Sequence, residues 1–121
     1  QSALAGEVQP VRDDLIELGL WLSENDQPTL LDDRTLYQAI AARGHARNLI
    51  LPFSHQFKNE MKRLQPHAQQ IVVANPSRPV AAMERVTQQF PEFFWNGAPG
   101  YVLAYDTGEW RVWRRQPQPN P

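Results

Sequence analysis

The chain has 121 residues, 41% of them hydrophobic and 21% charged, with a formal net charge of −1, which is typical of one soluble globular domain. It contains no cysteine, which excludes disulfides, thiolate metal ligands and cysteine nucleophiles and leaves the cellular compartment open. No apolar run approaches the ~18 to 20 residues of a membrane-spanning helix, and we expect no uncleaved signal peptide, because no basic region followed by an apolar stretch opens the chain.

The first part of the chain predicts a lead-in followed by a helix. Residues 1–10 form the lead-in, and Pro10 suits the entry to a helix. From Val11 to about Glu24 apolar side chains recur at helical spacing, with acidic residues near the start that favour the helix dipole. The segment Asn-Asp-Gln-Pro at residues 25–28 then ends this helix. Residues 29–31 fit either a short strand or the lead-in to the next helix.

A second helix is expected from Asp32 or Asp33, either of which can cap it, to about Arg43. Gly44 is suited to end it, because glycine readily adopts the left-handed conformation of a helix C-terminus. The side chains expected on its inner face are Leu36, Tyr37, Ile40 and Ala41.

The middle of the chain alternates strands with helices. The apolar run at residues 48–53 predicts a short buried strand, and Ser54 is placed to cap a third helix, residues 55–64. Residues 70–74, Gln-Ile-Val-Val-Ala, are the clearest strand because they are rich in β-branched side chains. A fourth helix is expected from Pro79 to the residue before Pro91. Its inward side chains are Val80, Met83, Val86 and Phe90.

The aromatic residues 93–95 are expected to pack as a plug ahead of a β-hairpin whose turn lies at Asp106-Thr107-Gly108-Glu109. Its register is open. A two-residue loop at 107–108 pairs Tyr105 with Trp110, whereas a three-residue loop with a bulge pairs Tyr105 with Glu109. In the second register Tyr101, Tyr105, Arg111 and Trp113 share one face and form an aromatic and basic surface. Residues 116–121 are a proline-rich tail.

The element order predicts an α/β fold. Strands that alternate with helices imply parallel neighbours, and the hairpin then extends one edge of the sheet. We therefore expect a single domain over residues 11–115, with a small mixed sheet, helices packed on it and a C-terminal antiparallel hairpin at one edge.

Part of this order has a parallel in a known fold. Between residues 48 and 113, the series strand, helix, strand, helix, Ala98-Pro99-Gly100 and hairpin resembles the second half of a thioredoxin-like domain. Where that family carries its Cys-x-x-Cys pair, this chain has Ser54-His55-Gln56-Phe57, and the closing helix of the family is missing. The resemblance therefore implies a scaffold without redox chemistry, and a fold alone does not confer function.

The candidate catalytic residues are explained more simply by structure. His45, His55 and His67 lack the spacing of metal ligands, so no metal site is expected. The glycine-rich motifs of nucleotide sites are absent, so we expect no cofactor and lean against an enzyme. The less favoured alternative is a small enzyme whose site lies at the strand ends near Ser54, His55 and Asn75.

Charge is distributed unevenly along the chain. Residues 1–33 carry eight acidic and one basic group, a net charge of −7, whereas residues 34–121 carry five acidic and eleven basic groups, a net charge of +6. The simplest interpretation is that the acidic first third folds against the basic remainder. The same asymmetry also occurs in domains that bind an acidic partner or nucleic acid.

The leading functional hypothesis is a non-catalytic interaction domain that binds a protein partner through a basic and aromatic surface on the hairpin and the adjoining helix. The alternative is a nucleic-acid-binding module that uses the same side chains, with guanidinium groups on phosphates and rings on bases. We expect no membrane insertion, and the oligomeric state stays open. The residues of this surface are Lys58, Lys62, Arg63, Tyr101, Tyr105, Arg111, Trp113, Arg114 and Arg115.

Overall fold

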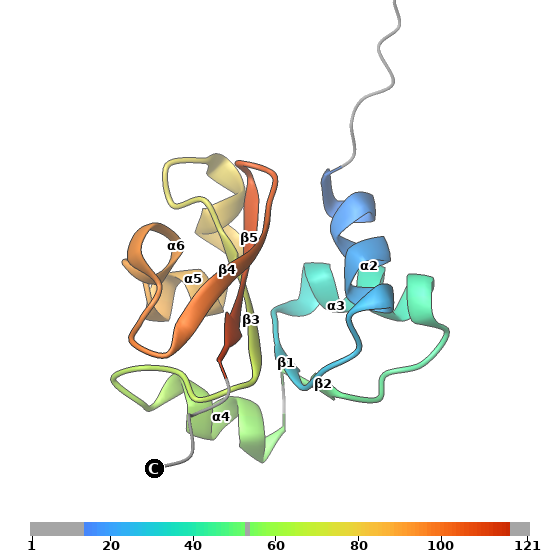
Figure 1. Ribbon diagram of the computed structural model, residues 1–121, viewed down its shortest axis with the longest axis horizontal. Coiled ribbons are helices and arrows are strands. Elements are labelled where there is room, and N and C mark those ends of the chain that lie inside the picture. The colour runs from blue at the N-terminus through green and yellow to red at the C-terminus, as the bar shows by residue number, and fades with distance from the viewer. Residues whose placement is uncertain (1–13, 53, 117–121) are drawn as a thin grey trace, which may run out of the picture.

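The computed structural model describes residues 14–52 and 54–116 (Figure 1). The predicted lead-in, residues 1–10, and residues 117–121 of the predicted tail lie outside the described residues. In chain order the elements are α2 (Asp14–Glu24), β1 (Thr29–Leu30), α3 (Asp33–Arg43), β2 (Leu49–Ile50), α4 (His55–Met61), β3 (Gln70–Ala74), the 3-10 helix η1 (Pro79–Met83), α5 (Arg85–Gln89), α6 (Phe93–Asn96), β4 (Tyr101–Asp106) and β5 (Trp110–Arg115).

The strands form one mixed sheet in the order β2-β1-β3-β5-β4. β1 lies parallel to β2 and β3, whereas β5 lies antiparallel to β3 and β4. The predicted α/β fold, with a mixed sheet and a C-terminal antiparallel hairpin at one edge, is confirmed. The second strand of the hairpin joins the sheet, so that β4 is the edge strand.

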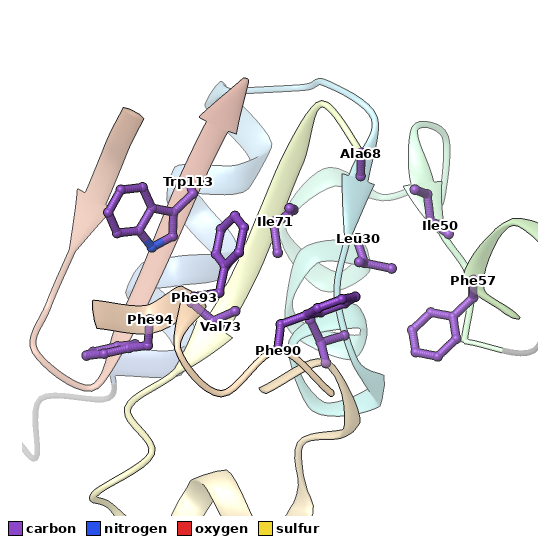
Figure 2. Close-up of a cluster of buried hydrophobic side chains, with 11 residues drawn as sticks. Leu30, Ile50, Phe57, Ala68, Ile71, Val73, Phe90, Phe93, Phe94 and Trp113 are labelled. Carbon is purple, nitrogen blue, oxygen red and sulfur yellow. The ribbon is translucent and has the colours of Figure 1, made fainter. Parts of the chain in front are cut away.

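Both faces of the sheet are covered by helices (Figure 1). On one face, Leu18 and Leu22 of α2 and Ala39 of α3 pack against Val72 and Val112 of the sheet. The other face is covered by α4, α5 and α6. Figure 2 shows the second cluster on this face, in which Phe57, Phe93 and Phe94 from the helices and Phe90 directly after α5 meet Leu30, Ile71, Val73 and Trp113 from the strands. All five residues of β3 are buried because the strand lies between these two layers.

Local signals explain where several helices begin and end. Asp32 caps α3 by accepting a hydrogen bond from the backbone N–H of Asp33, and Gly44 ends this helix with a φ of 81°. Ser54 caps α4, because its hydroxyl oxygen accepts a hydrogen bond from the N–H of Phe57. These predicted caps are confirmed. α2 packs closely on α3, since a Cβ at Gly19 would lie 2.7 Å from the carbonyl oxygen of Gln38.

Several predicted boundaries and faces were wrong. The strand predicted over residues 48–53 is only Leu49–Ile50, and α4 ends at Met61 rather than at residue 64. Tyr37, which was expected on the inner face of α3, is 76% exposed, and Ala41 is also exposed. Leu36 and Ile40 pack against the core as predicted, and the fully buried residues of α3 are Thr35 and Ala39.

The predicted fourth helix is interrupted. Residues Pro79–Met83 form η1 and residues Arg85–Gln89 form α5, because Glu84 between them is extended with a φ of −105° and a ψ of 107°. The carboxylate of Asp32 accepts hydrogen bonds from the backbone N–H groups of Arg85 and Val86 and thereby stabilises the start of α5. Met83, which was expected to face inward, is 70% exposed.

Candidate functional site

Neither predicted register of the hairpin is the one observed. Asp106 pairs with Arg111 and Tyr105 with Val112, and the register shifts between Leu103 and Tyr105. The turn is closed by a hydrogen bond from the N–H of Thr107 to the carbonyl oxygen of residue 110. Because the bulge at residue 104 reverses the alternation of side chains, Tyr101 and Tyr105 lie on opposite faces of the sheet.

The aromatic residues of the hairpin therefore do not form one exposed surface. Trp113 is buried and meets the ring of Phe93 edge to face, with a centroid distance of 5.9 Å. The hydroxyl of Tyr101 donates hydrogen bonds to the carbonyl oxygens of Pro66 and Ala68, and burial raises the pKa of Tyr101 to about 12. Tyr105 packs on the other face. These rings stabilise the fold, so the single aromatic surface of the predicted register was wrong.

Tyr105 meets α2 through the ring of Trp21, at a centroid distance of 5.1 Å. Arg114 lies on the same face, where its guanidinium donates hydrogen bonds of 2.7 and 3.0 Å to the side-chain oxygen of Gln70 and one of 2.9 Å to that of Asn25. The guanidinium of Arg114 and the ring of Tyr105 are thus both engaged in contacts within the fold.

The other two hairpin arginines are also bound internally. The guanidinium of Arg111 donates to the carbonyl oxygen of Phe94 at 2.8 Å, lies 4.5 Å from the centroid of the Phe94 ring and forms an ion pair with Asp106. Arg115 donates to the carbonyl oxygen of His67 at 2.7 Å. The structure thus brings the six hairpin residues of the predicted surface into intramolecular contacts on two sides of the sheet.

The three basic residues of the third helix separate into two groups. Lys58 on α4 and Lys62, which caps the C-terminus of α4, lie four residues apart; both are exposed, and neither forms an ion pair with any residue that the structure describes. Arg63 lies elsewhere. It forms an ion pair of 3.4 Å with Glu60 and lines a separate cleft beside His67.

A groove of about 530 Å³ lies between α4 and α5. Its floor is apolar, with Pro52 after β2 and the side chains of Phe57 and Met61 on α4. Cations and amides surround this floor. The polar lining residues are Lys58, Lys62, Arg85, Gln88 and Gln89.

Arg85 connects this groove with the end of β1. Its guanidinium forms an ion pair of 3.0 Å with Asp32 and a second of 3.6 Å with Asp33. It also lies 5.1 Å from the centroid of the Phe57 ring. Asp32 is buried, while the side chain of Arg85 is 42% exposed. Arg85 is therefore held in place from one side and still presents charge to the groove from the other.

Glu84, the residue before Arg85, is only 1% exposed. Its Oε1 atom is buried without a hydrogen-bond partner among the described residues. Burial, followed by the negative charge of Asp32, raises the pKa of Glu84 from its ordinary value of 4.5 to about 7. An uncharged carboxyl at the start of α5 is therefore stable at slightly acid pH.

The residues of the enzyme alternative have structural roles. The hydroxyl of Ser54 caps α4 and donates to the carbonyl oxygen of Leu51. The side-chain amide of Asn75 donates to the carbonyl oxygen of Gly108, and its side-chain oxygen accepts hydrogen bonds from Ser77. Neither of these residues, nor the exposed His55, lines the groove between α4 and α5.

In residues 14–52 and 54–116, no three His, Asp or Glu side chains come together as a metal site would require. No helix there has the length and apolar character needed to cross a membrane.

Sequence reasoning found Lys58 and Lys62 but missed the rest of the groove. Nothing in the local sequence distinguished Glu84 or Arg85 as a site residue, because both lie within a segment that was predicted to be one continuous helix. Asp32 was recognised only as a cap of the helix that it precedes. Its hydrogen bonds to residues 85 and 86 span 53 and 54 positions of the sequence, and no local pattern reports such a contact.

No protein-family model, curated protein or solved structure matches this chain. The resemblance of residues 48–113 to a thioredoxin-like domain is therefore not supported by any solved structure, and the case for function depends on the residues themselves.

Proposed function

We propose that this chain is a non-catalytic interaction domain that binds a short acidic segment with apolar anchors from a protein partner, in the groove between α4 and α5. The observation that carries the proposal is the apolar floor of Phe57 and Met61 beside two exposed lysines that have no ion-pair partner among the described residues.

The size and lining of the groove support this occupant. A volume of about 530 Å³ falls within the ~300 to 1,000 Å³ of ordinary ligand sites. Apolar side chains of a partner are transferred out of water when they pack on this floor, and this transfer favours binding. A few polar groups around the floor then determine the orientation of the partner. The amides of Gln88 and Gln89 can hydrogen-bond the backbone of an extended segment.

Charge complementarity selects an acidic partner. Lys58 and Lys62 lie on one side of the floor and Arg85 on the other. Two lysines one helical turn apart repel each other weakly, and a carboxylate between them relieves that repulsion. The guanidinium of Arg85 is 42% exposed, so it can donate further hydrogen bonds to a carboxylate of the partner while it stays paired with Asp32 and Asp33.

The groove is better suited than the hairpin to bind a partner. Arg111, Arg114 and Arg115 are each hydrogen-bonded within the fold, so a partner would have to compete with existing contacts. Of the residues in the predicted basic and aromatic surface, Lys58 and Lys62 line the groove. The interaction with a protein is retained as the function, and the groove replaces the hairpin as its site.

The test uses a short fluorescein-labelled peptide that alternates glutamate with leucine and phenylalanine, and its binding is measured by fluorescence anisotropy. Lys58→Glu and Lys62→Glu are each expected to weaken binding about fivefold, because each reverses a charge beside the peptide at roughly 1 kcal/mol. Arg47→Glu is the matched control, since Arg47 is an exposed cation that does not line the groove. Equal losses in all three variants would contradict the assignment of the site.

The same assay tests the nucleic-acid alternative. A labelled oligothymidylate replaces the peptide, and salt is titrated. Binding to phosphates weakens steeply as salt rises, roughly in proportion to the number of phosphates neutralised. If the oligonucleotide binds with such a slope and the acidic peptide does not bind, the domain is a nucleic-acid-binding module and the proposal fails.

A further inference from the structure

The junction between η1 and α5 contains a buried acid that the groove does not use directly. Glu84 is 1% exposed, and no hydrogen bond or ion pair joins its carboxyl to any described residue. A buried, unpaired carboxylate is strongly unfavourable, whereas a protonated carboxyl costs much less in the same place. The packed arrangement of this junction therefore favours the protonated form of Glu84.

Charged groups from two segments face Glu84. From the start of α3 come Asp32 and Asp33, which both favour its protonated form, and Arg34, which opposes them. Arg85, the next residue in the chain, also disfavours the protonated form of Glu84. Arg85 is already paired with Asp32 and Asp33, so it stabilises an ionised Glu84 less than an unpaired arginine would. Burial is the largest of these effects, and together they bring the pKa of Glu84 to about 7.

The same junction holds one wall of the groove. α5 starts directly after Glu84, and the Asp32 carboxylate fixes that start through the N–H groups of Arg85 and Val86. Three residues of α5 line the groove, namely Arg85, Gln88 and Gln89. Ionised Glu84 would place a second negative charge near the Asp32 carboxylate and would compete with it for Arg85. Any displacement of residue 84 toward water would move α5 and with it this wall.

We propose that a proton on Glu84 regulates the groove: the protonated carboxyl keeps α5 docked against the end of β1, and ionisation of the carboxyl undocks α5 and weakens partner binding. This inference rests on the proposed function for its biological meaning, but the movement of α5 is a property of the free protein. The direction is fixed, with tighter binding on the acid side of neutrality and weaker binding on the alkaline side.

The primary test is made on the free protein and needs no variant. The side-chain carboxyl carbon of Glu84 is followed by NMR as pH is raised, and a midpoint near pH 7 is expected. Hydrogen-exchange protection of Val86 and Phe90, corrected for intrinsic rates, should fall through the same midpoint, whereas protection of Ala39 on α3 should not. A midpoint below about pH 5, close to an ordinary glutamate, would overturn the proposal.

The second test measures affinity for the glutamate, leucine and phenylalanine peptide at about pH 6 and about pH 8, and a drop of at least about threefold is expected. Glu84→Gln should bind equally at both values, because the amide stays uncharged. His55→Gln is the control for histidine titration on α4 and should keep the drop. A Glu84→Gln variant that retains the full drop would overturn the proposal. Absence of peptide binding at both values would instead contradict the proposed function, and the NMR titration would still decide the switch.

Discussion

Gly97 shows how one residue can determine the packing of the hairpin. It ends α6 with a φ of 62°, a region that side chains of L-residues rarely adopt. A Cβ at this position would lie 2.5 Å from the Trp113 ring. Trp113 lies in the buried cluster beneath α6 (Figure 2), so its ring has little room to move. Glycine at residue 97 therefore serves two purposes: it permits the positive φ of the backbone, and it leaves space for the ring of Trp113.

Gly97→Ala is expected to lower the free energy of unfolding by about 2 to 5 kcal/mol, the sum of the strain of a positive φ and of overpacking. Urea denaturation followed by tryptophan fluorescence measures the loss. Gly100→Ala is the matched control, because Gly100 has a φ of 88° but nothing within 4 Å of the added Cβ. The control should lose only the strain, about 1 to 2 kcal/mol. Equal losses at the two positions would show that contact with Trp113 contributes nothing.

At the scale of elements, the helix caps differ in how far they reach. Ser54 caps only α4, through hydrogen bonds with residues three positions away. Asp32 caps α3 and also binds the first two N–H groups of α5 and the guanidinium of Arg85. One carboxylate therefore fixes two helices against the end of β1.

This difference predicts unequal costs for two cap removals. Ser54→Ala should lower the free energy of unfolding by about 1 kcal/mol, the usual value of an N-cap. Asp32→Ala should cost about 3 kcal/mol or more, because it also leaves Arg85 and the N–H groups of α5 without their buried partner. Thermal unfolding followed by circular dichroism compares the two variants. A loss no larger for Asp32→Ala than for Ser54→Ala would contradict the double role.

The same distinction explains what the sequence could reveal. The caps at Asp32, Ser54 and Gly44 act within a few residues, so local patterns predicted them correctly. The break at Glu84 was missed, because residues 79–90 contain apolar side chains at helical spacing, whereas the hydrogen bonds of Asp32 to residues 85 and 86, just after the break, come from a distant segment. The groove was predicted only in part for the same reason. Lys58 and Lys62 were recognised in the segment of α4, whereas Arg85 lies in a segment distant in the sequence.

The bulge near residue 104 had a comparable effect on the predicted surface. Alternation along a regular strand places Tyr101 and Tyr105 on one face, and the prediction of an aromatic surface depended on it. One extra residue in β4 transfers Tyr105 to the face of Trp21. The turn residues do not specify that shift, because they are compatible with more than one register.

At the scale of the whole molecule, the uneven charge of the sequence corresponds to contacts between its two parts. Asp26 forms an ion pair of 3.2 Å with Arg43, and Asp32 one of 3.0 Å with Arg85. The acidic first third thus contacts basic residues of the remainder, as the simplest interpretation of the charge pattern expected. Lys58 and Lys62 are cations that this pairing leaves available to a partner.

The pH dependence of global stability follows from the buried acid. The pKa of Glu84 is raised from 4.5 to about 7 on folding, so between these values the folded chain binds more protons than the unfolded chain. The stability that this group confers is fully present below about pH 4.5 and is lost as pH rises to about 7. The loss amounts to about 3 kcal/mol at most, since each pKa unit corresponds to about 1.4 kcal/mol.

Glu84→Gln isolates this contribution, because other carboxylates, such as Asp26 with its lowered pKa, titrate equally in both proteins. The free energy of unfolding in urea is measured for both proteins at intervals between about pH 4 and about pH 8. The variant should gain stability relative to the natural chain steadily up to about pH 7 and no further above it. A difference between the two proteins that does not change with pH would mean that Glu84 titrates alike in the folded and unfolded chain, and that its carboxyl is not held uncharged by the fold.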